Sequence, residues 1–460
     1  MACAWGAAGL ASAEHGMELL IERITDAGSG MARSQDGSVV FVSGAVLPGE
    51  TVEAEVTSRK KDFSLARLVR VVEGKGKEKN PRRVAPRCKV FKICGGCWLQ
   101  HAEYSLQLEI KASIVEDALE RLGGFRDRSV RGNVECEASP RQWNYRNKAS
   151  FPIGKVRGRP TAGFYAAGSH RVVPLPGCPV NAEPIERMFA AAQKSLPDLP
   201  VYDERSHAGA LRHLVLRAGA DSALASLVVG ERLNAKGMKD VARLAGVLGG
   251  LGLTTFTLNH NASAGNVILG RRTEAVTGSG VFEERYPDGF TLACDTASFL
   301  QVNTEQAARL YAFVAREVGG RVLELYSGVG ALTCYLARSA SEVVSVEEWE
   351  AAVGMAEANM RRNGVGNVTC LKGRAEQAEL SPSFDAVVLD PPRAGCERSL
   401  LDNILTAAPR RVVYVSCNPA TLARDAKILS EGYELKSVRA FDMFPQTMHV
   451  ETVAVLDRKE

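Results

Sequence analysis

Alternating apolar and polar residues, broken by turn signals, predict a small β-rich unit near the start of the chain. The alternating runs lie at 18–24, 39–42, 50–56 and 65–72. Short strands at this spacing, with Asp-Gly and Pro-Gly turns between them, are typical of a small β-barrel of the OB type. We expect this barrel to span 17–76. The small, apolar residues at 1–16 lack the basic start of a signal peptide, so we expect a disordered extension there or a true start at Met17.

The last third of the chain has a different pattern, in which strand-like apolar runs alternate with helical stretches. The strand-like runs lie at 322–326, 343–347, 386–390 and 411–416. The helical stretches lie at 332–338, 350–363 and 399–408. This alternation predicts an α/β fold with a doubly wound parallel sheet, and hence a Rossmann-like domain over 291–460.

The intervening region, 77–290, mixes short β runs with one helical stretch at 183–196. It predicts a central, mostly antiparallel α+β domain. Apolar positions at helical spacing over 105–122, followed by Gly123-Gly124, predict an amphipathic helix with a glycine stop. We expect this helix to pack on the C-terminal domain.

Composition favours a cytoplasmic, monomeric protein without a membrane partner. The hydrophobic content of 45% and the charged content of 24% are ordinary for a globular chain, and no run of 18 apolar residues occurs. Most of the eleven cysteines stand singly in apolar surroundings, which favours a reducing compartment over a disulfide framework.

Positive charge is concentrated in two tracts of the N-terminal half. Residues 59–92 hold thirteen Lys and Arg against three acidic residues, and 138–171 hold seven Lys and Arg and no acid. A solvated charged loop is one explanation. Aromatic residues interleave with the second tract, namely Trp143, Tyr145, Phe151, Phe164 and Tyr165. Because bases stack on such rings, the tracts favour a nucleic-acid partner.

Three cysteines cluster within the central region. Cys88, Cys94 and Cys97 stand close together, and Gly95-Gly96 lie inside the tighter loop. Two thiolates three positions apart can wrap one metal centre, and Cys178 in a Pro-Gly turn is the best candidate for a fourth ligand. Zinc and iron–sulfur clusters both use such spacing, so the residues alone leave the metal open.

Candidate chemistry gathers where the predicted parallel strands end. Cys417 follows the run 411–416, and ligands bind at the carboxyl ends of such strands, although free cysteines are most often simply buried. Gly328 and Gly330 follow the first strand, and Glu347 stands 19 residues after Gly328, near the offset at which a carboxylate meets ribose hydroxyls. The third glycine of a dinucleotide site is missing, which favours S-adenosylmethionine. Asp390 in Asp-Pro-Pro-Arg closes a later strand.

Ordered motifs then give a resemblance that covers the chain from about Met17 to its end. They are Gly28-Ser29-Gly30-Met31-Ala32, Val46-Leu47-Pro48-Gly49-Glu50, Ser298-Phe299-Leu300-Gln301-Val302-Asn303, Asp390-Pro391-Pro392-Arg393-Ala394-Gly395, Ser416-Cys417-Asn418-Pro419 and Phe444-Pro445-Gln446-Thr447-Met448-His449-Val450-Glu451. The first two resemble a TRAM domain, an RNA-binding barrel. With the cysteine spacing, the whole resembles the RNA 5-methyluridine methyltransferases, in the iron–sulfur-containing branch that modifies 23S ribosomal RNA.

The resemblance implies a role for each site residue. Cys417 would be the nucleophile that adds to carbon 6 of uracil, Glu451 the base that removes the carbon 5 proton, and Asp390 a contact of the base. The methyl-donor site would be formed by Gln301, Tyr326, Gly328, Gly330, Ala331, Glu347 and Asp390. A [4Fe-4S] cluster, rather than zinc, would be bound by Cys88, Cys94, Cys97 and Cys178.

Carbon 5 of uracil is too weak a nucleophile to take a methyl group unaided. A thiolate added to carbon 6 converts the ring to an enolate that can attack the sulfonium methyl, so this chemistry needs a cysteine and then a base. A thiol pKa of about 8.5 would need lowering, or the proton would have to transfer on attack. The resemblance favours 23S ribosomal RNA as substrate. Transfer RNA, a cytosine-5 enzyme, and an RNA-binding or ribosome-assembly protein with a degenerate methyltransferase domain are alternatives.

Overall fold

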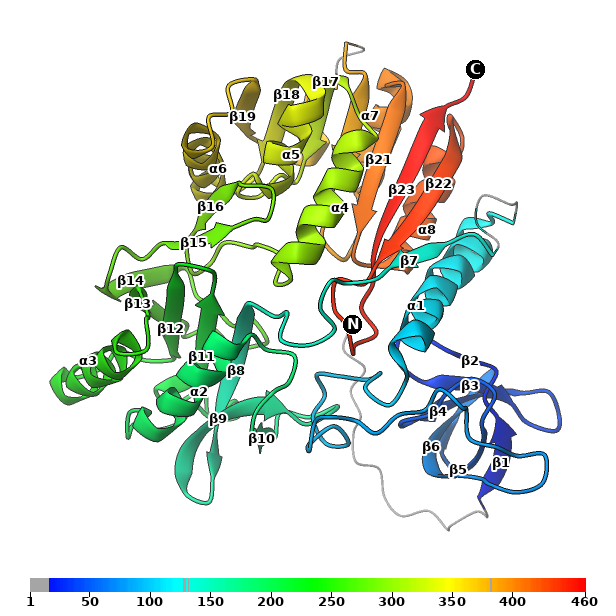
Figure 1. Ribbon diagram of the computed structural model, residues 1–460, viewed down its shortest axis with the longest axis horizontal. Helices are drawn as coiled ribbons and strands as arrows, with labels where there is room; N and C mark the ends of the chain where they lie inside the picture. Colours follow the sequence, from blue (N-terminus) through cyan, green and yellow to red (C-terminus); the bar gives the residue numbers. More distant parts are fainter. Residues whose placement is uncertain (1–15, 127–129, 131, 381–382) are drawn as a thin grey trace.

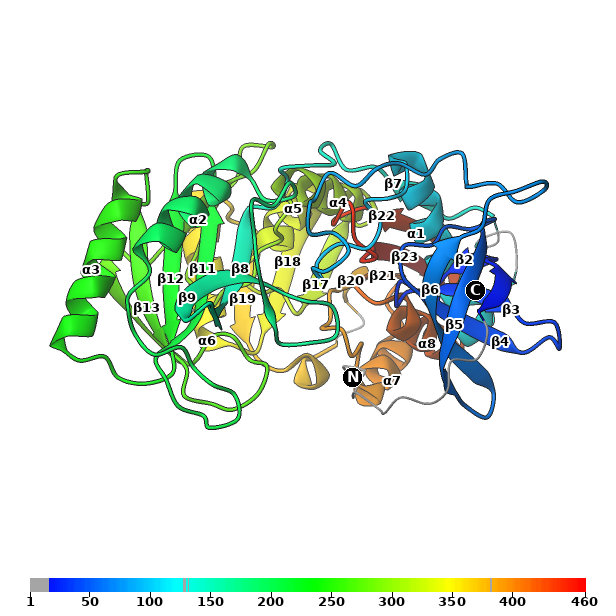
Figure 2. The ribbon, with the colours of Figure 1, turned by 90° about the horizontal axis from the view of Figure 1, so that it is seen from below.

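The computed structural model describes residues 16–126, 130, 132–380 and 383–460. The extension expected at 1–16 therefore lies almost wholly outside the described residues. The described residues form three large sheets and one two-stranded hairpin (Figure 1). In the view of Figure 2 the C-terminal sheet lies between the central sheet and the N-terminal sheet. No helix in the described ranges combines the length and hydropathy that a membrane crossing would need.

The N-terminal sheet is closed into a barrel. Its strands, in the order β1-β5-β6-β4-β3-β2, are β1 Met17–Leu20, β2 Arg23–Ile24, β3 Gly30–Arg33, β4 Val39–Ser43, β5 Thr51–Arg59 and β6 Phe63–Val71. The two strands at the ends of this order, β1 and β2, are consecutive parts of one extended segment, so that segment joins both edges of the sheet. Alternate side chains of β4 and β5 point inward, which explains the alternating apolar pattern of the sequence.

The central sheet has seven strands in the order β10-β9-β8-β11-β12-β13-β14. These are β8 Lys148–Val156, β9 Arg159–Tyr165, β10 Val172–Pro174, β11 Leu211–Ala218, β12 Ala223–Val229, β13 Thr255–His260 and β14 Arg272–Thr277. Neighbouring strands are antiparallel except β12 and β13. Helices α2 (Glu183–Ser195) and α3 (Ala235–Gly249) cover one face and form a core with it.

The prediction of one helix in this region was wrong, because α3 is a second. Its buried positions Val241, Leu244, Ala245 and Leu248 have helical spacing. The segment also holds Gly237, Gly246 and Gly249. Glycine disfavours an isolated helix by about 1 kcal/mol per residue, so here packing on the sheet overrides local propensity.

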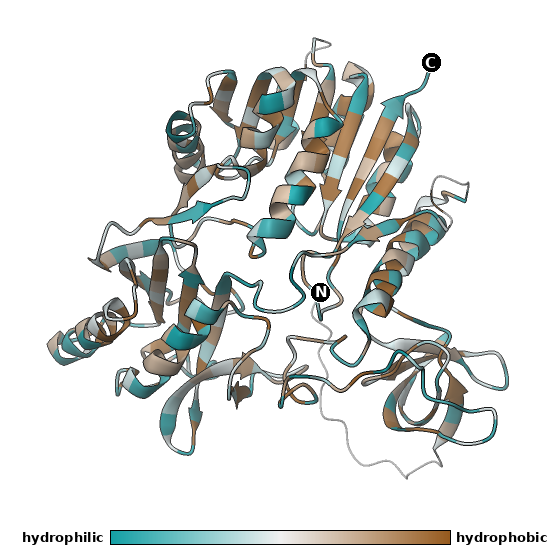
Figure 3. Ribbon diagram, viewed as in Figure 1, coloured by the Kyte–Doolittle hydropathy of each residue, from teal (hydrophilic) through white to brown (hydrophobic). Residues whose placement is uncertain are grey.

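The C-terminal sheet has eight strands in the order β19-β18-β17-β20-β21-β23-β22-β7. They are β7 Glu135–Glu137, β17 Gly320–Leu325, β18 Ala340–Glu347, β19 Val368–Lys372, β20 Ala386–Leu389, β21 Arg411–Ser416, β22 Tyr433–Phe441 and β23 Glu451–Arg458. The strands from β19 to β21 are parallel, and β23 runs antiparallel between β21 and β22. The strands are predominantly apolar (Figure 3) because both faces are covered.

Two hydrophobic cores flank this sheet. Helices α4 (Thr304–Arg316), α5 (Ala331–Ser339) and α6 (Glu350–Arg362) pack on one face, where the hairpin β15 (Phe282–Arg285) and β16 (Thr291–Cys294) also lies. Helices α7 (Arg398–Ala407) and α8 (Pro419–Leu429) pack on the other, next to the short 3₁₀ turn η2 (Ala375–Gln377).

The helix expected at 105–122 is α1 (Tyr104–Ala118), which continues as a π-helical turn, Leu119–Gly123 (η1). Gly124, not Gly123, supplies the left-handed stop, with φ of 81°. Val115 and Leu119 join the core on the α7–α8 side of the C-terminal sheet, and β7 pairs with β22 at its edge. The segment from α1 to β7 therefore packs on the C-terminal sheet, although it precedes the central sheet in sequence.

Candidate active site

The registers of the last strands bring a thiol and a carboxyl group together. Ser416 at the end of β21 pairs with Thr452 on the antiparallel strand β23. Cys417 directly follows Ser416 and Glu451 directly precedes Thr452, so the two lie across from each other. Glu451 is 4% exposed and Cys417 is half-buried. A turn at Asn418, whose side chain caps α8 through the Ala420 N–H, holds the thiol at the strand end.

Asp390 completes this group from the neighbouring parallel strand β20, whose last residue, Leu389, pairs with Tyr414 of β21. Burial raises the pKa of Asp390 to about 7. Burial, together with the charge of Asp390, raises the pKa of Glu451 to about 8. A carboxyl group with a pKa in this range can hold or release a proton near neutral pH, as an acid–base catalyst must.

The thiol of Cys417 is kept protonated in the ligand-free protein. Burial and the charge of Glu451 raise its pKa to about 11, while the guanidinium of Arg393 acts in the opposite direction. Of the two routes open to a cysteine nucleophile, the structure therefore favours loss of the proton on attack over a preformed thiolate.

The loop between β22 and β23, which leads into Glu451, is anchored to distant parts of the chain. Lys111 of α1 forms a fully buried ion pair with Asp442 and donates to the Phe444 carbonyl at 3.0 Å. The Tyr145 hydroxyl donates to the Pro445 carbonyl at 2.9 Å. Asn303 donates to the Met443 carbonyl at 3.1 Å.

Gln446 connects this loop to two other segments of the chain through hydrogen bonds. Its backbone has φ of 73°, a left-handed conformation that non-glycine residues rarely adopt. Its side-chain Oε1 accepts a hydrogen bond from Gln107 Nε2 of α1, and its backbone N–H donates to Gln107 Oε1. Its carbonyl accepts the N–H groups of Trp98 and Leu99, both at 3.0 Å. The cysteine-rich loop therefore rests directly on the loop that carries Glu451.

The turn after β17 has the features of a nucleoside-binding site. Tyr326 takes a left-handed φ of 66°, and its hydroxyl donates to Glu376 at 3.3 Å. The Glu347 carboxylate accepts the Gly328 and Trp349 N–H groups, each at 2.9 Å. Nothing lies within 4 Å of where a Gly328 side chain would begin, so a ligand can approach this backbone closely.

Gly330 closes the turn and must be glycine. Its φ is 83°, and an added Cβ would lie 2.9 Å from the Met360 side chain. Ala331, 8% exposed, then begins α5, whose free N–H groups point toward the same turn. The turn therefore leaves open space and free N–H groups beside the predicted cofactor residues.

Gln301 lies in the loop before α4. Asn303, two residues later, donates to the Met443 carbonyl, so this loop lies close to the loop between β22 and β23. The Gln301 side chain is 5% exposed, and its Oε1 has no hydrogen-bond partner in the protein. Such an unpartnered acceptor is costly and is typical of a group that meets a ligand. Phe299, two residues earlier, is 68% exposed and presents a ring on which a base can stack.

The four cysteines predicted to bind a metal lie in one neighbourhood. Charges on Cys94 and Cys88 raise the pKa of Cys97, and a charge on Cys97 raises that of Cys178, although burial is the larger cause in both. Cys94 forms a β-bridge to Ala166. Within the described ranges, however, no three potential ligands converge closely enough to bind one ion.

Sequence reasoning did not identify Arg393, Lys111 or Gln446 as functional. Arg393 lies in a quoted motif, and the structure places it beside the site: its carbonyl accepts the Asn418 side-chain N–H at 3.0 Å, and its charge lowers the pKa of Cys417 and Glu451. Lys111 and Gln446 contact partners more than 300 residues away in sequence. Their only sequence signal is a polar residue on the buried side of an amphipathic helix and an unremarkable glutamine.

Comparisons with known proteins agree with this arrangement. The TRAM domain model matches residues 16–69, a small methyltransferase domain matches 290–414, and the tRNA (uracil-5-)-methyltransferase model matches 374–459. An uncharacterized RNA methyltransferase of Gloeobacter violaceus is 41% identical over 454 residues, covering 95% of each chain. One of Halalkalibacterium halodurans is 37% identical over 458 residues, covering 96% of this chain and 97% of its own.

A solved structure is similar over nearly the whole length. It is the tRNA (uracil-54, C5)-methyltransferase of Pyrococcus abyssi in complex with S-adenosyl-L-homocysteine. The TM-score is 0.73 and the identity 29%, with 96% of this chain and 99% of that chain covered.

Proposed function

This chain belongs to the RNA uracil-5-methyltransferase family, and from that premise we propose that it methylates carbon 5 of a uridine in 23S ribosomal RNA. S-adenosylmethionine is the methyl donor and a covalent adduct of Cys417 the intermediate. The placement of Cys417 opposite Glu451 at the strand ends carries this proposal, because the reaction needs a nucleophile and a base on one uracil ring. The enzyme acts as a cytoplasmic monomer.

The first step forms the bond between Cys417 Sγ and carbon 6. The electron pair of the carbon 5–carbon 6 double bond moves toward O4 of the uracil, which becomes an enol. Asp390, whose pKa of about 7 leaves a proton available, donates to O4 and receives the thiol proton. Arg393 stabilises the developing negative charge, since it already lowers the pKa of both Cys417 and Glu451.

The later steps release the product. Carbon 5 attacks the methyl carbon of the bound donor, the methyl–sulfur bond breaks, and the sulfonium leaves as a neutral thioether. O4 releases its proton to water, because Asp390 already holds the thiol proton, and becomes a carbonyl again. Glu451 then removes the carbon 5 proton, the Sγ–carbon 6 bond breaks, and Cys417 is reprotonated. The raised pKa of Glu451, about 8, makes it a stronger base than a solvated glutamate.

The donor site consists of residues from four segments, namely the loop before α4, the β17–α5 turn, the end of β18 and the end of β20. Gln301, Tyr326 and Asp390 surround the reacting end, while Gly328, Gly330, Ala331 and Glu347 hold the nucleoside. The open space over Gly328 and the unpartnered Oε1 of Gln301 support this assignment.

Transfer RNA is the second candidate substrate. The observation that favours it is the similarity to the Pyrococcus abyssi enzyme, whose name specifies uracil 54 of tRNA. Mapping 5-methyluridine in ribosomal and transfer RNA from a deletion strain distinguishes the two. Loss of a 23S modification supports the first proposal, and loss confined to tRNA replaces it with the second.

We also propose a [4Fe-4S] cluster on Cys88, Cys94, Cys97 and Cys178. Four thiolates of one zinc ion lie at about 2.3 Å from it and so must converge tightly, whereas a cluster separates its ligands by its own width. The charges of Cys94 and Cys88 contribute, after burial, to the raised pKa of Cys97, and that of Cys97 to the raised pKa of Cys178, which supports one shared centre for these thiols. Iron and acid-labile sulfide in anaerobically purified protein support the cluster, and stoichiometric zinc without sulfide overturns it.

RNA containing 5-fluorouridine tests the covalent mechanism. Fluorine replaces the proton that Glu451 removes, so the reaction stops after methyl transfer with Cys417 still bonded to carbon 6. We expect a denaturation-resistant protein–RNA complex that forms only with the methyl donor present. Absence of the complex with both ribosomal and transfer RNA rejects the mechanism.

A further inference from the structure

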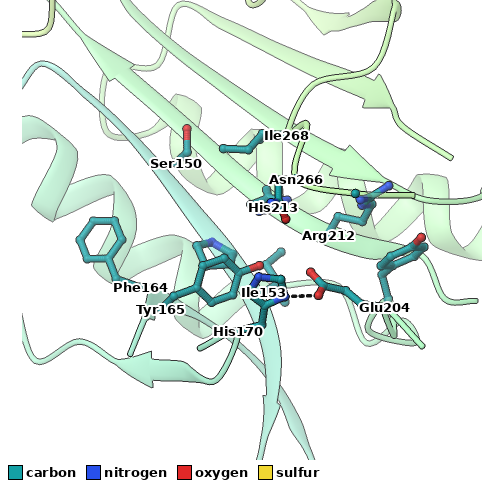
Figure 4. Close-up of a pocket in the computed structure, with 13 residues that line it drawn as sticks. Ser150, Ile153, Phe164, Tyr165, His170, Glu204, Arg212, His213, Asn266 and Ile268 are labelled. Atoms are coloured by element: carbon teal, nitrogen blue, oxygen red, sulfur yellow. Dashed lines mark hydrogen bonds and ion pairs between the residues drawn. The ribbon is translucent and has the colours of Figure 1, made fainter. Parts of the chain in front are cut away.

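A cavity of about 340 Å³ opens on the central sheet, apart from the active site. Its size is within the range of small-ligand sites, roughly 300–1,000 Å³. Strands β8, β9 and β11 supply its floor, and loops at 202–204 and 265–268 supply its rim (Figure 4). Three aromatic rings line it, those of Phe164, Tyr165 and Tyr202.

A β-bulge shapes the cavity. Successive residues of a strand normally point to opposite faces, yet Arg212 and His213 both line this cavity. The register of β11 against β12 shifts between Leu211 and His213, which leaves Arg212 as the extra residue. Bulges are typical of places where a side chain is redirected toward a site.

Arg212 is held rigidly in the wall. Its Nη1 donates to the carbonyls of Asn261 and Ser263, both at 2.7 Å, and its guanidinium lies 4.1 Å from the ring centroid of Tyr202. Tyr165 is covered in a similar way by His170, with ring centroids 5.2 Å apart. Two rings are therefore fixed before any ligand arrives, which lowers the entropic cost of binding.

The polar groups of the cavity suit a base better than a phosphate. His213 Nδ1 is buried without a hydrogen-bond partner, and burial lowers the pKa of His213 to about 4, so its ring is neutral. A neutral imidazole has one donor and one acceptor nitrogen. Glu204, which contacts His170, adds an acceptor that would repel a phosphate. Mixed donors and acceptors among aromatic rings match the edge and faces of a nucleobase.

The cavity lies on the sheet face that leads toward the active site. Ser150 lines it, and Lys148 is on the same face of β8, two residues or about 7 Å away. Lys148 pairs with Arg217 of β11, and Arg217 donates to the Leu300 carbonyl at 3.1 Å, directly before Gln301. Lys148 and the buried Arg217 therefore link the strands that line the cavity to the loop that holds Gln301.

We propose that this cavity binds one unstacked base of the RNA substrate, close in sequence to the uridine that is methylated. The inference rests on the proposed function for its ligand, because it assigns the cavity to the same RNA. A second captured base fixes the position of the RNA strand relative to Cys417 and so contributes to the choice of target.

Substitution of Tyr202 tests the proposal. Removal of a stacking ring costs about 1–3 kcal/mol per base, so Tyr202→Ala should weaken RNA binding by about 5- to 100-fold. Tyr202→Phe, which keeps the ring, should bind nearly as wild type and shows that the loss is not unfolding. Leu251→Ala is the matched control, since Leu251 is exposed near the end of α3 on the opposite side of the same sheet.

An abasic scan of the RNA identifies the captured base. One abasic position beside the target should weaken binding to the wild-type protein by a similar factor and have no further effect on Tyr202→Ala. Wild-type affinity of Tyr202→Ala, or losses that add at every abasic position, would overturn the proposal. Failure of the proposed function is a different result, in which the wild-type protein forms no 5-fluorouridine adduct at saturating RNA while binding still responds to Tyr202.

Discussion

The strand ends of the C-terminal sheet bury acidic side chains, whereas the open face of the central sheet buries basic ones. At the strand ends, burial raises the pKa of Asp390 to about 7 and of Glu451 to about 8. On the central face, burial lowers the pKa of Lys148 to about 8 and of His213 to about 4.

Burial thus moves both groups of side chains toward their uncharged forms, with different consequences. In the first region it creates acids and bases that exchange protons near neutral pH. In the second it leaves the His213 ring neutral at pH 7, while Lys148, with a pKa of about 8, stays largely protonated. We infer that the first region performs the chemistry and the second binds the RNA.

Removal of the Cys417 thiol should have the largest effect, because it should stop methyl transfer at the strand ends and leave RNA binding intact. We expect Cys417→Ala to lower methyl transfer by roughly 10³-fold or more, as for other covalent nucleophiles, and to leave RNA affinity unchanged. Methyl incorporation and filter binding measure the two quantities. Cys370→Ala is the control, because Cys370 lies on the edge strand β19, away from the strand ends. Turnover of Cys417→Ala near that of the control would contradict the assignment.

Loss of the base should stop the reaction later. We expect Glu451→Gln to lower turnover by about 10²–10⁴-fold and to accumulate protein joined to methylated RNA. The amide cannot accept the carbon 5 proton, so elimination of Cys417 stalls. Denaturing gels and mass spectrometry of the joined nucleotide detect the species, and Glu434→Gln on the exposed side of β22 is the control. If Glu451→Gln turns over slowly but accumulates no protein–RNA adduct, Glu451 is not the base that removes the carbon 5 proton.

The sequence allowed the strand-end residues to be predicted but not their support. Cys417 and Asp390 stand at the ends of apolar strand-like runs, where periodicity and chemistry agree, whereas Glu451 was predicted from the family resemblance alone. Lys111 and Gln446 act through contacts across more than 300 residues, which no local pattern encodes.

Some elements of secondary structure were likewise predicted from the sequence and others were not. Strands β17, β18, β20 and β21 were predicted to within three residues at each end, because buried parallel strands are continuous apolar runs. Helices α4 and α8 were not identified, although Asn303 and Asn418 cap their first turns through side-chain oxygens. Both asparagines stand in motifs where a side chain can either contact a ligand or cap a helix, and the sequence alone does not separate the two roles.

The buried anchor of the catalytic loop should matter more than an exposed ion pair. Replacement of Lys111 leaves the Asp442 carboxylate buried without its partner. Lys111→Met should therefore lower the free energy of unfolding, measured in urea, by about 3–5 kcal/mol. Lys372→Met, which removes an exposed pair with Glu350, should cost about 0–1 kcal/mol. The double variant Lys111→Met with Asp442→Leu should recover part of the loss. Equal losses for Lys111→Met and Lys372→Met would contradict the anchoring role.

The smallest effect is also the most direct test of the contrast between the two regions, because their pH dependence has opposite sign. A carboxyl group whose pKa is raised from 4.5 to about 8 on folding destabilises the protein progressively as pH rises between those values. Glu451→Gln should therefore gain stability relative to wild type as the pH rises from 5 to 8, and gain no more above pH 8.

Lys148 should show the reverse. Its pKa is lowered from 10.5 to about 8, so its destabilising effect grows as pH falls from 10.5 to 8 and is constant below. Thermal midpoints across pH 5–10 should place the slope of the Glu451→Gln difference below pH 8 and that of the Lys148→Met difference above it. Parallel slopes for the two variants would mean that the two regions do not differ in the way burial acts on their charges.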